Sequence, residues 1–203
     1  MTSNDSPIDK TKEKNKSRIL LKKFLLDLVS KYWHNLKYLP KKEPLQKNEI
    51  IDWEPSELWE LVIALASANV LTWIRAKGKD FVENRADAKC FLTQKKQNIK
   101  QQGKEQWTHC AQIKGIEKKE GPLFILAWDV INNMPLFFHV PHEAYFGKVQ
   151  MVEIVFERHA STKKVSYINE PFTGKIKRTY KWWEYECSTF EEMLKLDTVR
   201  KAA

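Results

Sequence analysis

The stretch "PLFILAWDVINNMPLFFHVP", residues 122–141, decides the fold of this protein. Its first half is almost wholly apolar, which is typical of a central strand covered on both faces. The motif "INNMP", residues 131–135, predicts a hairpin turn. We therefore expect a hairpin in the core, with a central strand over 122–131 and a second strand over 135–140.

Two segments before this hairpin show the alternation of a strand. In "RADAKCFL", residues 85–92, every second residue is small or apolar, whereas Arg85, Asp87 and Lys89 occupy the other face. The segment "WTHCAQIKGI", residues 107–116, alternates in the same way. One buried face and one polar face are expected for each strand. The strands predicted outside the hairpin cover residues 85–93, 107–116, 149–157, 163–168 and 177–186.

Helices are predicted at both ends of the chain. Residues 17–39 carry apolar side chains at helical spacing, and residues 1–16 are expected to be a disordered basic tail. Residues 53–80 predict a buried second helix, with Pro55 in its first turn. The segment "STFEEMLKL", residues 188–196, has capping-box spacing and predicts a C-terminal helix.

This order of elements predicts an α/β (α+β) fold in one domain. N-terminal helices precede a mixed, largely antiparallel sheet, and a helix follows it. The 203 residues suffice for one sizeable domain. We expect residues 17–203 to form it, with 17–45 as a helical extension and 52–203 as the core.

Charge and composition narrow the class of partner. Lys and Arg total 35 against 26 for Asp and Glu, a net charge of +9, which favours a polyanion such as nucleic acid. No apolar run approaches the roughly 18 residues of a membrane span, and no signal peptide is expected. Three widely spaced cysteines without a CxxC pair fit a reduced, cytoplasmic protein with no structural zinc. Phosphate-binding glycine motifs are absent from the sequence, so no nucleotide cofactor is expected.

The polar faces of two predicted strands indicate a catalytic site. Asp87 and Lys89 are separated by one residue, as are Gln112 and Lys114, so each pair leaves one face of its strand. If the strands are neighbours, the two faces converge. A carboxylate, an amide oxygen and a lysine suit Mg²⁺ and a phosphodiester.

These segments resemble the PD-(D/E)XK nuclease superfamily, which includes many restriction enzymes. The resemblance rests on "RADAK", "AQIKG" and the hairpin, and covers about residues 55–145. It implies a restriction-endonuclease-like fold and Mg²⁺-dependent cleavage of DNA. It makes Asp87 and Gln112 metal ligands and Lys114 the catalytic lysine. Glu60, on the preceding helix, would be a supporting acid.

Two positions depart from the family pattern. Ala86 stands where the family often has proline. Gln112 stands where an acid is usual, and its neutral oxygen lowers the expected metal affinity or leaves a fold without catalysis. A second acid-x-lysine spacing occurs at 117–119 (Glu-Lys-Lys), in an expected turn. Alternatively, Asp87, Lys89 and Lys114 form ion pairs on a solvated sheet face.

A protein that binds nucleic acid without cutting it is the alternative function. "KIKRTYKWWEY", residues 175–185, interleaves basic and aromatic residues, which suits single-stranded nucleic acid. The same pattern also fits an amphipathic strand. A third alternative is a structural protein whose charge only keeps it in solution, and a homodimer is left open. The residues expected to contact nucleic acid are Lys95, Lys96, Lys100, Arg178 and Lys181.

Overall fold

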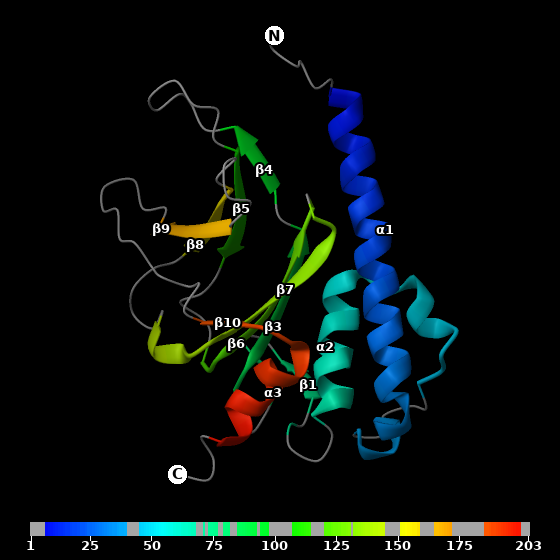
Figure 1. Cartoon of the computed structure of the whole chain (residues 1–203). Coiled ribbons are helices and arrows are strands. Elements are labelled where there is room, and N and C mark those ends of the chain that lie inside the picture. The colour runs from blue at the N-terminus through cyan, green and yellow to red at the C-terminus, as the bar shows by residue number, and fades with distance from the viewer. Residues whose placement is uncertain are drawn as a thin grey trace.

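The computed structural model shows a mixed α/β fold with a mixed sheet, as the order of elements predicted (Figure 1). The structure describes residues 7–39, 45–67, 71, 73–76, 79–81, 85–92, 94–97, 107–114, 120–130, 132–144, 151–158, 165–171 and 185–199. Some of these, including strands β4, β5, β8 and β9, are described in their backbone alone. No described helix is long and apolar enough to cross a membrane.

The core sheet is built on the hairpin at residues 122–141. Its strand order is β10 (Glu186–Cys187), β7 (Met134–Val140), β6 (Leu123–Asp129), β3 (Asp87–Leu92). Strand β6 is buried along its whole length, which confirms the predicted central strand. It pairs antiparallel with β7 and parallel with β3. The hairpin turn is also confirmed: Asn133 has φ 51°, a region that Asn tolerates better than most residues.

Three helices pack against this sheet. Helix α1 (Pro7–Tyr32) lies against α2 (Pro55–Ala66), and together they cover one face of the sheet (Figure 1). The Trp59 Nε1–H of α2 donates to Phe124 O at 3.0 Å and so joins the helix to β6. Helix α3 (Phe190–Val199) contacts β7. Its N-terminus is capped as predicted, because Glu192 N donates to Thr189 Oγ1 at 3.1 Å.

Two helix predictions were wrong in extent. Helix α1 begins at Pro7, so residues 7–16 are helical and not a disordered tail. Proline suits a first helical turn, and the polar residues after it are compatible with an exposed helix. Helix α2 ends at Ala66, where the Ser67 hydroxyl donates back to Ile63 O at 2.5 Å. The rest of the expected helix contains β1 (Trp73–Ala76) and β2 (Lys79–Phe81), an antiparallel pair.

A second four-stranded sheet begins with β4, the strand that comes directly after β3 in the chain. Its order is β4 (Gln94–Gln97), β5 (Trp107–Lys114), β8 (Met151–Arg158), β9 (Val165–Pro171), with every pair antiparallel. These bounds confirm the strands expected at 107–116, 149–157 and 163–168. Most of the strand expected over 177–186 lies outside the described residues. Three short 3-10 helices, Trp33–Tyr38, Glu49–Asp52 and His142–Ala144, complete the described elements.

Candidate functional site

The candidate site begins where the chain enters β3. Arg85 has φ 55°, an unfavourable region for a residue with a Cβ, and its guanidinium lies 3.5 Å from the Glu120 carboxylate. Asp87 N then donates to Pro122 O at 3.0 Å, toward β6. Because backbone groups alternate in direction along a strand, those of Ala88 point to the other side. In its sheet β3 is the last strand, so Ala88 lies on the outer edge.

Charged side chains occupy this outer edge. Ala88 N donates to Asp80 Oδ2 at 2.7 Å, and Lys89 Nζ donates to Ala88 O at 3.2 Å. Asp80 belongs to β2. Its backbone N–H donates to Ala86 O at 2.8 Å, and this bond holds β2 beside the start of β3. The carboxylate and the ammonium therefore satisfy both backbone groups of Ala88, which would otherwise be open to pairing with another strand.

Asp87 and Lys89 form an ion pair on one face of β3. This confirms that the two side chains leave the same face, and it confirms the alternative of an ion pair on that face for Asp87 and Lys89. The expectation of a solvated polar face was wrong at Asp87, because only 2% of its side chain is exposed, against 29% for Lys89. A carboxylate this deeply buried needs a compensating charge, and Lys89 supplies one. The alternation of residue types could reveal the face but not its depth.

The charge state of Lys89 depends on opposing effects. Burial lowers the pKa of Lys89, and the negative charges of Asp80 and Glu60 act to raise it. Contact with Asp87 also favours the protonated amine. Burial prevails, so the pKa lies below the ordinary value of 10.5. Lys89 is therefore a lysine held in an acidic, partly dehydrated environment.

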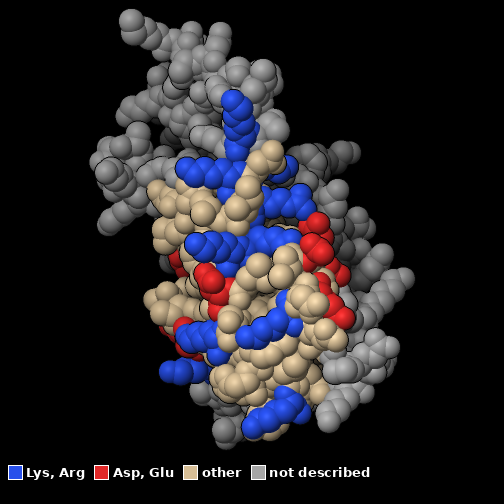
Figure 2. Space-filling model, turned by 90° about the vertical axis from the view of Figure 1, so that its right-hand side faces the viewer, with Lys and Arg blue, Asp and Glu red and all other residues tan. Residues whose placement is uncertain are grey.

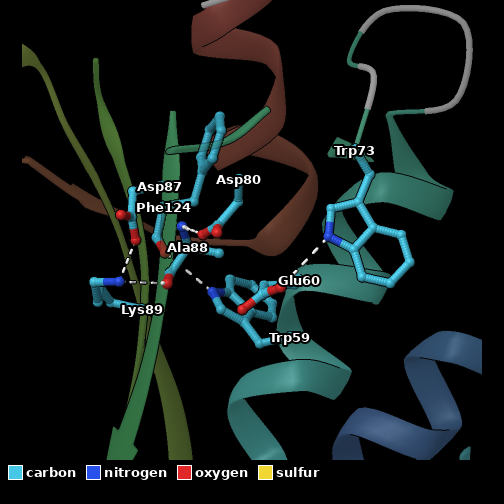
Figure 3. A network of polar contacts seen from close by, with 8 residues as sticks. All are labelled: Trp59, Glu60, Trp73, Asp80, Asp87, Ala88, Lys89 and Phe124. Carbon is cyan, nitrogen blue, oxygen red and sulfur yellow. Dashed lines mark hydrogen bonds and ion pairs between the residues drawn. The ribbon is translucent and has the colours of Figure 1, made fainter. Parts of the chain in front are cut away.

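Glu60 approaches this cluster from α2. Its carboxylate accepts a hydrogen bond from Trp73 Nε1 at 3.4 Å, which orients it from the β1 side. Figure 3 shows Asp80 and Glu60 on the α2 side of β3, whereas Asp87 and Lys89 lean to the other side. Two of the predicted site residues, Asp87 on β3 and Glu60 on α2, thus lie close enough to Lys89 to affect its charge. They act on Lys89 from different sides.

Sequence reasoning placed Lys89 beside Asp87 on the strand face without giving it a catalytic role, and it did not single out Asp80. That role could have been found, because "DAK", residues 87–89, itself has the acid-x-lysine spacing of the nuclease pattern. Asp80 was not considered because the second helix was predicted to continue to residue 80, whereas it ends at Ala66. Its place in a strand next to β3 became visible only in the fold.

In the described ladders, β3 and the strand that carries Gln112 and Lys114 are not hydrogen-bonded neighbours, which was the condition for their polar faces to converge. Strand β3 pairs with β6, and β5, which carries Gln112 and Lys114, pairs with β4 and β8. Gln112 lies opposite Glu153, and Lys114 lies opposite Met151. Because the side chains of β5 are outside the described part, the joint site of Asp87 with Gln112 and Lys114 stays a prediction.

Two of the five predicted nucleic-acid contacts lie on β4, the strand that pairs with β5. Lys95 and Lys96 belong to β4, opposite His109 and Thr108, and only their backbone is described. The other expected contact residues and the second acid-x-lysine spacing lie outside the described residues: Lys100, Arg178, Lys181 and 117–119. These assignments also remain predictions.

Comparison of the chain with protein-family models, with curated proteins and with solved structures finds no match. The cluster on β3 must therefore be interpreted from its own chemistry. It combines a buried carboxylate, a lysine whose pKa is lowered by burial, and two further carboxylates within electrostatic reach. Perturbed titratable groups gathered in this way are candidates for a functional site.

Proposed function

We propose that this protein is a metal-dependent endonuclease of the restriction or mobile-element type, which hydrolyses DNA phosphodiester bonds. The observation that carries the proposal is the pairing of Asp87 with Lys89 on one face of β3. Their spacing is the acid-x-lysine arrangement of the PD-(D/E)XK nucleases. The net charge of +9 supports a polyanionic substrate. A restriction-endonuclease-like fold is part of this proposal.

Lys89 is a second candidate for the catalytic lysine, beside Lys114. A buried ammonium is well suited to offset the charge that develops on a phosphate, because the electrostatic effect is larger away from water. Asp80 and Glu60 would keep Lys89 charged before the substrate arrives.

Carboxylate oxygens, such as those of Asp87, Asp80 and Glu60, are ligands that Mg²⁺ prefers. Of these three residues, Asp87 lies on the same side of β3 as Lys89. Mg²⁺ is commonly held by one or two carboxylates together with substrate phosphates and water. Among the residues that the structure describes, no three His, Cys, Asp or Glu side chains could hold a metal ion together. As the family resemblance implies, Asp87 and Gln112 would hold the metal, while Asp80 and Glu60 would act on Lys89 through their charge. A bound Mg²⁺ would acidify a water molecule and stabilise the leaving oxygen.

Cleavage of duplex DNA by the purified protein, with Mg²⁺ or with a chelator, tests this function. Asp87→Asn should abolish cleavage and preserve DNA binding, because it removes a metal ligand but no positive charge. Asp52→Asn, at an exposed acid in the 3-10 helix Glu49–Asp52, is the matched control and should cut normally. Undiminished cleavage by folded Asp87→Asn protein would show that the site lies elsewhere.

Separate alanine variants of the two lysines identify the catalytic one. If Lys89 acts in the transition state, Lys89→Ala should lose cleavage, and Lys114→Ala should retain it. The family resemblance predicts loss in Lys114→Ala. Either loss keeps the proposal, and full activity in both variants refutes the role of a lysine.

A nucleic-acid-binding module without catalysis is the second candidate. It is favoured by the contacts at the outer edge of β3, where Asp80 and Lys89 already satisfy the backbone of Ala88. Such charges protect an edge strand from unwanted pairing, which is a structural task. This protein would bind DNA in a salt-dependent manner and leave it intact with Mg²⁺.

A further inference from the structure

The part of α1 from Pro7 to Lys23 is strongly basic, and most of its described side chains are exposed. Between Pro7 and Lys23 the chain has seven basic and two acidic residues, so this segment holds more than half of the net charge of +9. Figure 1 shows the N-terminal end of α1 extending beyond α2. The described side chains from Lys12 to Lys16 are all exposed, although they point in different directions around the helix.

Three lysines form a row on the outer side of α1. Lys12, Lys16 and Lys23 are exposed, and their spacings of four and seven residues place them along one side of the helix. Figure 2 shows basic side chains running along this face of the molecule. At 1.5 Å per residue, the row from Lys12 to Lys23 is about 16 Å long. We call these three residues the α1 row.

Two other basic residues of α1 form ion pairs with the rest of the protein. Arg18 lies 2.5 Å from the Glu54 carboxylate, and Lys31 lies 2.7 Å from the Glu191 carboxylate. Within the described residues, no ion pair is found for the three lysines of the α1 row. Their charges are therefore available to an external anion, whereas those of Arg18 and Lys31 help to hold the helix on the domain.

We propose that the α1 row binds the phosphate backbone of duplex DNA. The B-DNA major groove is about 12 Å wide, so a row of about 16 Å with flexible lysine ends can reach phosphates on both of its sides. The inference takes only DNA as the partner from the proposed function and does not require cleavage.

The packing of α1 argues against a membrane as the partner. A helix that lies in a membrane surface inserts its apolar face among the lipids. In α1 that face is occupied, because Leu21, Leu25 and Val29 are buried in the core of the protein. Among the described side chains of α1, Ile19, with 69% of its surface exposed, is the one large apolar residue that is exposed. One side chain offers too little apolar surface for stable insertion.

The test compares two variants of the full chain with equal net charge. One replaces the α1 row (Lys12→Gln, Lys16→Gln, Lys23→Gln). The control replaces three exposed lysines elsewhere (Lys37→Gln, Lys47→Gln, Lys195→Gln). Binding to a duplex DNA is measured at several salt concentrations, with duplex RNA and phosphatidylserine vesicles as parallel probes. Circular dichroism checks that both variants fold.

Loss of three phosphate contacts should reduce the slope of log K against log salt by about 2.7, since each contact contributes about 0.9. DNA affinity of the α1-row variant should fall at least about tenfold below that of the control. Equal slopes in the two variants, or a loss seen only with RNA or vesicles, would overturn the inference. If the wild type cuts DNA and the α1-row variant binds normally, only this inference fails. If the wild type binds through α1 but never cuts, only the nuclease proposal fails.

Discussion

Removing Lys89 should destabilise the protein more than removing the charge of Asp87. The two side chains form an ion pair, but their surroundings differ in charge. Lys89→Met leaves the Asp87 carboxylate, 2% exposed, without its ammonium partner. Asp87→Asn leaves Lys89 near the carboxylates of Asp80 and Glu60, so the remaining charge is still compensated.

The expected loss in the free energy of unfolding for each variant follows from the burial of the group that remains. Breaking a buried pair by removing one partner costs about 3–5 kcal/mol. The partly exposed Lys89 places Lys89→Met near the lower end, at about 3 kcal/mol. Asp87→Asn should cost about 1 kcal/mol, the net value of one hydrogen bond, because the charge of Lys89 stays compensated. In the double variant neither charge remains, so its loss should be smaller than that of Lys89→Met alone. The coupling energy of the cycle should be about 1–3 kcal/mol.

Urea denaturation of the wild type, the two single variants and the double variant at pH 7 measures this cycle. The slopes of the unfolding free energy against urea should agree, so that the midpoints report stability. Equal losses in the two single variants would contradict the asymmetry. Strict additivity in the double variant would show that the pair does not form in solution, and the candidate site would lose its central contact.

Two further variants have expected outcomes. Trp59→Phe should cost about 2 kcal/mol in urea denaturation, because the bond to Phe124 O is lost and the buried site is left with a gap; an unchanged midpoint would contradict this packing. Glu191→Gln should cost less than about 1 kcal/mol at pH 7, since the pair with Lys31 is half exposed. The hydrogen bond from Lys31 lowers the pKa of Glu191 from 4.5 to about 2, so this difference should be present above pH 4.5 and shrink as the pH falls toward 2; a constant difference would argue against the contact.

The sequence by itself determined the centre of the fold. A continuous apolar run over residues 123–128 can be accommodated only where both faces of a strand are covered, and β6 is such a strand. Local chemistry was also sufficient for the hairpin turn and for the start of α3, because turns and caps are specified by neighbouring residues. The shared face of Asp87 and Lys89 followed from the two-residue period of a strand.

Tertiary structure alone decided which strands and charges meet. The pairing of β3 with β6 joins segments more than thirty residues apart, and local periodicity does not contain that information. The same holds for the burial of Asp87 and for the approach of Asp80 and Glu60 to Lys89. Alternation along a strand determines which side chains share a face. The neighbours that cover this face, and hence the dielectric environment and the charge of each group, depend on contacts that form only when distant segments pack together.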